Sequence, residues 1–215
     1  MLKNKSIQKT LLRWLCTLGI SLAMISISVL IILNSTSLYA LIVDFYELPY
    51  ETNLTRQALI ENYRQITTYL QVPWIRELQM SDFYMSETGR IHFHEVKIII
   101  QVLYFIFIIT TFTWVLAQIK SIKTLPIFNQ AANLILVTIS SLILLMFIDF
   151  SKAFTWFHKL LFNNDYWIFN PITDPVILAL PEELFLIFGV IICLILFIQC
   201  LLIKVIYLKK KRRYI

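Results

Sequence analysis

Glycine and cysteine are scarce in this 215-residue chain, which contains three of each. No GxGxxG or GxxxxGK sequence occurs, so the chain lacks the glycine-rich loops that bind nucleotide phosphates. No CxxC pair is present, and three cysteines are too few for a disulfide framework. Cys16, Cys193 and Cys200 lie in apolar stretches, where we expect them to act as small packing residues. These absences argue against a nucleotide-dependent enzyme and against a disulfide-stabilised domain.

Charged residues make up only 15% of the chain, whereas hydrophobic residues make up 59%. Four runs contain no Asp, Glu, Lys or Arg: 14–43, 98–119, 124–148 and 184–203. A helix needs about 20 apolar residues to cross a membrane, and each run is at least that long. The sequence therefore predicts an all-α membrane protein that forms a single membrane domain over residues 1–215. Its four transmembrane helices are expected at about 14–36, 98–119, 127–148 and 184–204.

Acidic and basic residues are segregated along the chain. All thirteen Asp and Glu residues lie in two long connections, 44–97 and 149–183. Lys and Arg dominate the N-terminal tail, the short link 120–123 and the tail from residue 204 onward. Since cytoplasmic loops carry the excess of Lys and Arg, we expect both termini in the cytoplasm and both long connections outside. The net charge of +6 then reflects topology, and no nucleic-acid partner is predicted.

Both long connections have patterns typical of structured segments with interfacial or re-entrant helices. In the first, Thr55 begins a helical stretch that Pro73 ends, with apolar residues at helical spacing at Leu59, Tyr63, Ile66 and Leu70. Residues 86–89 have the composition of a turn. In the second, Asp149 is a suitable N-cap for a short aromatic helix. We expect the aromatic stretch 150–171 to fold onto the bilayer surface or into its outer leaflet.

The three histidines, His92, His94 and His158, all lie in the long connections. A neutral imidazole is the usual general base near neutral pH, so a pair of them could share proton transfer. The alternative is that each is an interfacial residue with an apolar body and a polar tip. His92 and His94 would point about 200° apart on a helix, so no shared metal site is predicted. Ser86 and Ser151 lack the GxSxG context of a serine nucleophile.

The run MSETGRIHFHEVK at 85–97 is followed about sixty residues later by FHKLLFNNDYWIFNPITDPVILALPEELF at 157–185. With LIENYRQITTYLQVP at 59–73 and the arrangement of spans, these motifs resemble the lipoprotein intramolecular transacylases (Lit) of Gram-positive bacteria. The resemblance covers nearly the whole chain. The turn reads Ser-Glu-Thr-Gly here, where the family pattern has Ser-Glu-Ser-Gly or similar.

The resemblance implies an activity and its substrate. These enzymes move the sn-2 acyl chain of a diacylglyceryl-cysteine to the α-amino group of the same cysteine, giving a lyso lipoprotein. The family's catalytic histidines fall on His92 and His158, and no role is carried onto His94. The expected substrate contacts are Ser86, Glu95, Lys97, Tyr63, Trp167 and Asn170.

The acyl donor lies within the substrate, so no cofactor and no metal is expected. The expected partners are diacylglyceryl-modified lipoprotein N-termini and membrane lipid, with no obligate protein partner. The active site is expected at the outer leaflet of the cell membrane.

Three alternatives remain at this stage. A non-catalytic accessory protein that binds lipid or lipoprotein would tolerate loss of the histidines. A small transporter or channel is disfavoured because the four apolar runs contain no ionisable side chain. A membrane protease is disfavoured because neither an HExxH sequence nor a nucleophile motif occurs.

Overall fold

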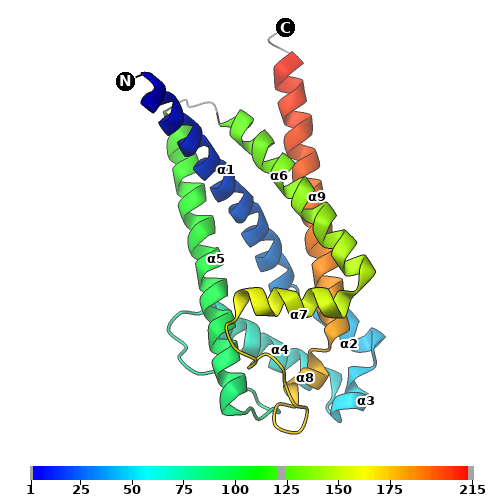
Figure 1. Ribbon diagram of the computed structural model, residues 1–215. Coiled ribbons are helices and arrows are strands. Elements are labelled where there is room, and N and C mark those ends of the chain that lie inside the picture. The colour runs from blue at the N-terminus through cyan, green and yellow to red at the C-terminus, as the bar shows by residue number, and fades with distance from the viewer. Residues whose placement is uncertain (1, 121–123, 213–215) are drawn as a thin grey trace. The chain divides into compact units, whose positions relative to one another are not determined.

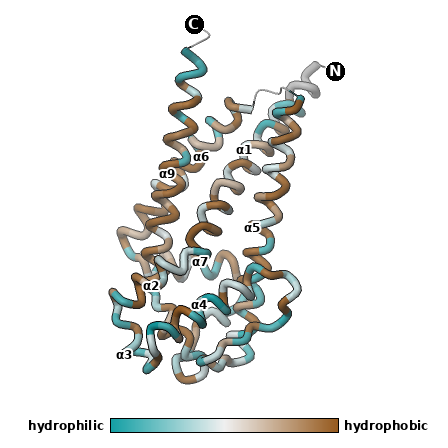
Figure 2. The backbone as a smooth tube through the Cα atoms, turned by 180° about the vertical axis from the view of Figure 1, so that it is seen from behind, coloured by the Kyte–Doolittle hydropathy of each residue, from teal (hydrophilic) through white to brown (hydrophobic). Residues whose placement is uncertain are grey.

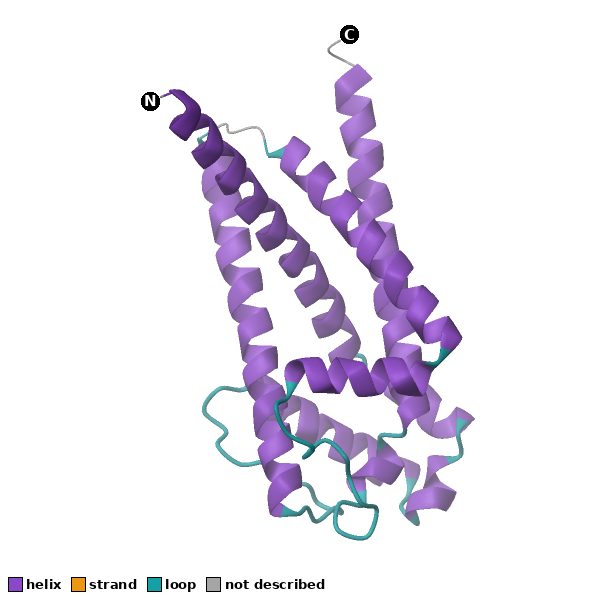
Figure 3. Cartoon of the chain, viewed as in Figure 1, coloured by secondary structure: helices purple, strands orange, loops and turns teal. Residues whose placement is uncertain are grey.

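The computed structural model describes residues 2–120 and 124–212, with side chains from residue 7 onward. Residues 121–123 of the expected cytoplasmic link, and the side chains of Lys3 and Lys5, lie outside this description. The described part consists of helices and connecting loops without strands (Figures 1 and 3). The helices are α1 (Leu2–Leu33), α2 (Thr36–Phe45), α3 (Leu48–Thr52), α4 (Arg56–Gln71), α5 (Glu87–Ile119), α6 (Leu125–Ile148), α7 (Phe150–Leu161), α8 (Val176–Ala179) and α9 (Glu182–Arg212).

Four of these helices are long and apolar enough to cross a membrane. They are α5, α6, α9 and the part of α1 from Ile7 to Leu33. Hydrophobic residues run along most of their length in Figure 2, whereas α3, α4 and the loops near them are more polar. The prediction of an all-α membrane protein with four spanning helices is confirmed.

The chain divides into two compact units. The first comprises Met1–Val29, Leu103–Leu144 and Ile191–Ile215. Its core is formed by residues of α1, α6 and α9: Ile20, Met24, Ala131, Ala132, Ile135, Ile139, Cys193, Leu196 and Cys200. Small residues at such interfaces let helix backbones approach closely, which favours packing where lipid removes the hydrophobic driving force.

Polar atoms buried in the first unit are paired within or between its helices. The hydroxyls of Ser21 and Ser28 donate to carbonyls one turn earlier, and Gln199 Nε2 donates to Ser28 Oγ at 2.9 Å. Such pairing avoids unsatisfied groups in a lipid-facing bundle. As expected, Cys193 and Cys200 are buried packing residues, whereas Cys16 is exposed.

The second unit comprises Leu30–Val102 and Leu145–Val190, so it contains all three histidines. Its core is built around two tyrosines, Tyr39 of α2 and Tyr63 of α4, whose rings stack at 4.1 Å. Tyr39 Oη donates to the carbonyl of Ala179 at the end of α8, and Tyr63 Oη donates to the carbonyl of Leu33. Both tyrosines therefore tie segments that are far apart in the sequence.

Helix α4 agrees with its sequence pattern. Thr55 Oγ1 accepts from Ala58 N at 3.1 Å and caps the helix, which ends at Gln71, two residues before Pro73. Its predicted apolar face is buried at Leu59, Tyr63, Ile66 and Leu70. The amphipathic period of the sequence and the N-cap thus specify this helix.

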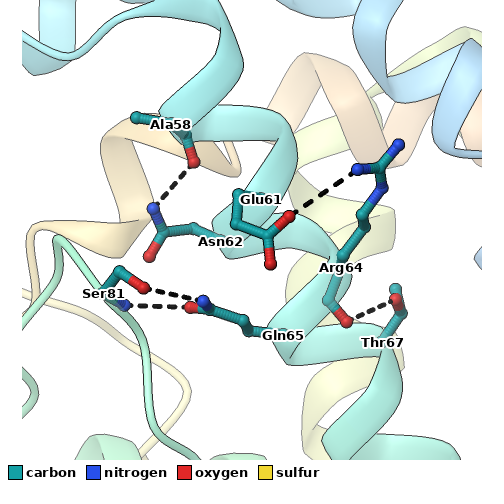
Figure 4. Close-up of polar contacts among 7 residues, drawn as sticks. All are labelled: Ala58, Glu61, Asn62, Arg64, Gln65, Thr67 and Ser81. Atoms are coloured by element: carbon teal, nitrogen blue, oxygen red, sulfur yellow. Dashed lines mark hydrogen bonds and ion pairs between the residues drawn. The ribbon is translucent and has the colours of Figure 1, made fainter.

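The polar side of α4 holds the segment that precedes α5. Gln65 and Ser81 exchange two hydrogen bonds, from Gln65 Nε2 to Ser81 Oγ and from Ser81 N to Gln65 Oε1 (Figure 4). Asn62 and Asp82 exchange a second pair beside the first. A side-chain amide that donates and accepts at once fixes the register of the segment it pairs with. These bonds hold residues 81 and 82 against α4, shortly before α5 begins.

Two details differ from the sequence prediction. Residues 86–89 do not form a turn, because α5 already begins at Glu87 and Ser86 Oγ accepts from Gly89 N at 3.0 Å. Serine is a strong N-cap, and the capped turn continues directly into the apolar run. The first apolar run is not one helix either: α1 ends at Leu33, and α2 begins at Thr36.

Candidate active site

Helix α7 places His158. Asp149 caps its start, accepting from Lys152 N at 3.0 Å. Trp156, Phe157 and Leu160 are exposed, which leaves a broad apolar surface on this helix. His158 is less exposed and lies one turn after Phe154, whose ring is 4.1 Å away. The amphipathic helix thereby presents an apolar surface on one side and the imidazole on another.

His158 is held in one tautomer. Its Nδ1 lies 2.8 Å from the carbonyl oxygen of Phe154, and a carbonyl can only accept, so Nδ1 carries the proton. In the neutral ring, Nε2 then has a free lone pair. Burial lowers the pKa of His158 below its ordinary value, against a smaller raising effect of the Phe154 hydrogen bond. The residue is therefore a neutral base at neutral pH.

His92 is the sixth residue of α5, and only 7% of it is exposed. Aromatic rings surround it, at centroid distances of 4.8 Å for Phe162, 5.5 Å for Phe169 and 6.0 Å for Phe93. Its Nδ1 is buried and has no hydrogen-bond partner among the described residues. A buried polar atom without a partner is rare and is often explained by function.

The two histidines lie close to each other. Their ring centroids are 6.1 Å apart, and Phe162 contacts both, at 4.8 Å from His92 and 5.8 Å from His158. Trp167 stacks on His158 at 4.7 Å. One atom that hydrogen-bonds to two nitrogens spans about 5.4–6 Å between them, so a single substrate group can contact both rings. We call this cluster of His92, His158, Phe162, Trp167 and Phe169 the histidine pocket.

Glu95 lies one turn after His92 on the same side of α5. Its Oε1 accepts from Asn164 Nδ2 at 2.8 Å, while its Oε2 is buried and has no hydrogen-bond partner among the described residues. Asn164 also accepts, through its backbone oxygen, from Trp167 Nε1 at 3.1 Å. Glu95 is thereby linked through Asn164 to the tryptophan that stacks on His158.

Lys97 and Tyr63, two further predicted substrate contacts, have contacts elsewhere. Lys97 is buried, and its Nζ donates to the carbonyls of Val72 and Ile75 while lying 4.3 Å from the Tyr69 ring centroid. It satisfies carbonyl groups of the segment that follows α4. Tyr63 is buried against Tyr39, as described above. The structure does not bring either residue to the histidine pair.

Ser86 and Asn170, the other two, stabilise the backbone near the pocket. Besides capping α5, Ser86 donates its backbone N–H to Asp174 Oδ1 at 2.8 Å. Asn170 Oδ1 accepts from Ile172 N, and its backbone oxygen accepts from Asp174 N, so it forms the turn before α8. His94 is exposed, in agreement with its predicted direction away from His92.

Several residues of this site were not identified from the sequence. Phe162, Phe169 and Asn164 were not predicted as site residues, because nothing in their spacing indicates which side chains meet His92 and Glu95. Asp174 is buried at 3% exposure and joins α5 to the loop before α8. Asp174 precedes Pro175, and from the sequence alone an Asp-Pro pair is explained equally well by turn formation. The pair therefore does not identify Asp174 as a buried residue of the site.

The alternative chemistries receive no geometric support. In the part of the chain that the structure describes, no three His, Cys, Asp or Glu residues are grouped as metal ligands. Ser151 Oγ donates to Glu182 Oε1 at 2.6 Å and is not paired with a histidine. A surface hollow of about 610 Å³, lined by Arg64 and Arg76 among others, contains neither His92 nor His158. A base held neutral, with a second imidazole beside it, favours proton-transfer chemistry without a covalent nucleophile.

Comparison with known proteins decides between enzyme and accessory protein. A family model described as lipoprotein intramolecular transacylase Lit matches residues 14–185. The chain belongs to the lipoprotein intramolecular transacylase (Lit) family. It is therefore a membrane acyltransferase that acts in lipoprotein processing. The resemblance inferred from the motifs at 85–97 and 157–185 is confirmed, and the accessory-protein alternative is set aside.

Solved structures of the membrane-integral Lit from Bacillus cereus are similar to this chain over almost its whole length. One has 29% sequence identity and a TM-score of 0.86, covering 97% of this chain and 99% of that one. A variant with a histidine replaced by arginine has 28% identity and a TM-score of 0.79, covering 100% and 98%. A variant with a histidine replaced by alanine has 30% identity and a TM-score of 0.77, covering 99% of each. No curated protein matches significantly.

Proposed function

We propose that the protein transfers the sn-2 acyl chain of a diacylglyceryl-cysteine lipoprotein to the α-amine of the same cysteine, with His158 as general base and His92 as its partner. The observation that carries this proposal is the fixed tautomer of His158. Its Nδ1–H is bound to Phe154, so the free Nε2 is the atom available to take a proton. His92, 6.1 Å away, lies within reach of the same substrate group.

The proposed reaction needs one group that takes up a proton from the amine and then gives it to the leaving oxygen. After the substrate ammonium has lost a proton to solvent, the amine nitrogen attacks the ester carbonyl carbon. His158 Nε2 takes a proton from that nitrogen and returns it to the glyceryl oxygen as the ester C–O bond breaks. His92 donates an N–H hydrogen bond to the carbonyl oxygen while it is an oxyanion. The products are an amide and an alcohol, and His158 ends neutral.

The aromatic side chains of the histidine pocket have a positioning role in this proposal. Amine and ester belong to one molecule, so orientation alone can supply about 7–11 kcal/mol of the barrier in favourable cases. Rigid rings on both histidines restrict how the substrate folds. Of the six predicted substrate contacts, we assign Glu95 and Trp167 to the substrate. Ser86, Lys97, Tyr63 and Asn170 hold the frame of the second unit.

We also propose that both termini face the cytoplasm and that the histidine pocket faces outside. The segregation of acidic and basic residues supports this orientation. So do contacts in the first unit, where Arg13 of α1 pairs with Gln130 of α6, and Lys204 of α9 pairs with Asn133 of α6. Cysteine scanning with an impermeant thiol reagent tests it, after the native cysteines are replaced by alanine. Arg56→Cys should be labelled in intact cells and Lys123→Cys should not; the reverse pattern overturns the orientation.

The activity itself is tested by mass spectrometry of lipoprotein N-termini. The chain is expressed in cells that lack their own lipoprotein N-acyltransferase, and a model lipoprotein is digested and analysed. We expect N-acyl, S-monoacylglyceryl peptides when the chain is present and diacylglyceryl peptides with a free amine when it is absent. Unchanged peptides in cells that contain the folded protein in their membrane would refute the proposed function.

A further inference from the structure

The unpartnered oxygen of Glu95 is a feature that acid–base catalysis by the two histidines does not use. This oxygen, Oε2, is buried and has no hydrogen-bond partner among the described residues. A carboxylate oxygen in a dry site has a large desolvation cost, so it needs a donor. The donor must come from a molecule that enters the pocket.

The direction of this oxygen is fixed. Asn164 Nδ2 holds the other oxygen, Oε1, at 2.8 Å, which prevents the carboxylate from rotating freely. Glu95 and His92 are three residues apart on α5, so both side chains lie on one side of the helix. The two buried atoms without partners, Glu95 Oε2 and His92 Nδ1, are thus carried on the same side of α5, and Asn164 links Glu95 to Trp167 of the histidine pocket. An occupant of this pocket meets one acceptor with full negative character and one imidazole.

The chemistry of the occupant follows from this pair within an aromatic lining. Phe162, Phe169 and Trp167 provide no charge, so the Glu95 carboxylate is the acidic group among these side chains. A buried carboxylate favours a cationic N–H donor over a neutral one, because the cation adds Coulomb attraction to the hydrogen bond and compensates the buried negative charge. A primary ammonium supplies three such N–H groups and no acceptor.

We propose that Glu95 is the receptor for the free α-ammonium of the substrate and that it distinguishes an unacylated N-terminus from an acylated one. This inference rests on the proposed function and deepens it. Before transfer, the ammonium nitrogen donates to Glu95 Oε2. After it loses a proton to solvent, the remaining amine still donates one N–H to Oε2, which directs its lone pair toward the ester.

The same contact distinguishes substrate from product. When the acyl chain has moved, the nitrogen belongs to an amide with no charge and one N–H. The ion pair with Glu95 is lost, and the carboxylate favours release of the lyso product and exchange for a new ammonium. A lipoprotein that already carries an N-acyl chain is excluded for the same reason.

The test compares the binding of two lipopeptides that cannot react, since an ether replaces the ester at sn-2. One has a free α-amine and the other an N-acetyl group. Purified wild-type protein should bind the free-amine lipopeptide about 10- to 100-fold more tightly. Glu95→Gln keeps the shape and the acceptor for Asn164, and should reduce this ratio to near one without weakening binding of the N-acetyl lipopeptide.

Two further variants serve as controls for this test. Asn164→Ala removes the hydrogen bond to Glu95 Oε1 but keeps the carboxylate, so the preference for the free amine should persist in part. Glu95→Ala should lose the preference for the free amine as Glu95→Gln does. Two Glu95 variants are used so that the test remains possible if one of them does not fold. The inference is overturned if the wild type shows no preference, or if a folded Glu95 variant keeps the wild-type ratio. Failure of the proposed function is separate: the wild type would then bind the ester lipopeptide without converting it.

Discussion

The imidazole rings of His92 and His158 lie 6.1 Å apart, although 65 residues and two long apolar helices separate them in the sequence. Phe162 contacts both rings. This spacing suits two groups that act on neighbouring atoms of one substrate group. It differs from a hydrogen-bonded pair in which one histidine only orients the other.

Loss of either histidine is expected to abolish most of the activity. A positioned general acid–base contributes typically about 10²–10⁴-fold, so His92→Ala and His158→Ala should each reduce the transacylation rate by that order. The double variant should be little worse than either single one, because residues that act as a unit give non-additive losses. Rates are measured by mass spectrometry with purified protein and a diacyl lipopeptide.

His94→Ala is the matched control, since His94 is exposed on the same helix. It should stay within a few-fold of the wild-type rate. A double variant whose loss equals the product of the two single losses would contradict joint action of the pair, provided that all variants accumulate in the membrane.

The titration of His158 provides a second prediction. Burial lowers its pKa below the ordinary value of 6.5, so the ring is neutral above pH 6.5 and gains its second proton only in more acidic solution. The neutral form is favoured in the folded state, so its contribution to stability is full above pH 6.5 and is lost as the pH falls below it. The rate should lose its His158-dependent component over the same acidic range.

Nitrogen NMR of protein labelled with ¹⁵N-histidine measures this directly, with the His158 signals assigned from a His158→Gln variant. We expect a midpoint below pH 6.5 and, in the neutral form, a proton on Nδ1. A midpoint above 6.5, or a neutral form protonated on Nε2, contradicts the assignment of Nε2 as the base.

Within the aromatic stretch 150–171, Trp167 contacts His158. Its ring stacks on the imidazole at 4.7 Å, and its Nε1 donates to the carbonyl of Asn164. Trp167→Ala should lower the transacylation rate by about tenfold or more while leaving the amount of protein in the membrane almost unchanged. Trp156→Ala is the control, because Trp156 is 71% exposed on α7. Equal effects of the two substitutions would contradict a positioning role for Trp167.

Gly89 is a close-approach position at the start of α5. An added Cβ would meet Asp174 Oδ1 in direct overlap and Met85 Cγ at 2.7 Å. Asp174 is fixed by the Ser86 backbone N–H, so Gly89→Ala should destabilise the protein by about 1–3 kcal/mol, despite the higher helix propensity of alanine.

Thermal unfolding in detergent measures this effect against Gly19→Ala. At Gly19 the nearest atom to an added Cβ is Thr110 Oγ1 at 3.9 Å, which is ordinary contact. Gly19→Ala should therefore be neutral or slightly stabilising. A Gly89→Ala protein with the melting temperature of the wild type would show that the Asp174 region can relax.

The elements that the sequence predicted well have signals contained within a single helix. Charge-free runs identify the four long apolar helices, and the apolar spacing after Thr55 identifies α4, because burial on one side leaves a periodic pattern. The turn expected at 86–89 was wrong because the same Ser-containing stretch suits a turn and a helix N-cap. The break between α1 and α2 occurs at Asn34 and Ser35 within a run that is uniformly free of charge.

The site could be predicted only in part, because its geometry depends on contacts between distant segments. The resemblance selected His92 and His158, and the structure places their rings together. Nothing in the sequence shows that Asn164 holds Glu95, or that Lys97 is directed to the carbonyls after α4. From the sequence, a lysine at the end of an apolar run could equally bind a lipid headgroup, extend to the membrane surface or donate to the last carbonyls of a helix.

The central claim, acyl transfer within one molecule, is tested most directly by isotope labelling. Purified protein is given an equal mixture of two diacyl lipopeptides that differ in peptide mass, only one of which carries a deuterated sn-2 chain. Mass spectrometry of the products should show the deuterated chain in amide linkage on its own peptide alone, with the sn-2 position of that peptide free. Deuterated amide on both peptides, or an amide without loss of the sn-2 chain, would contradict the account.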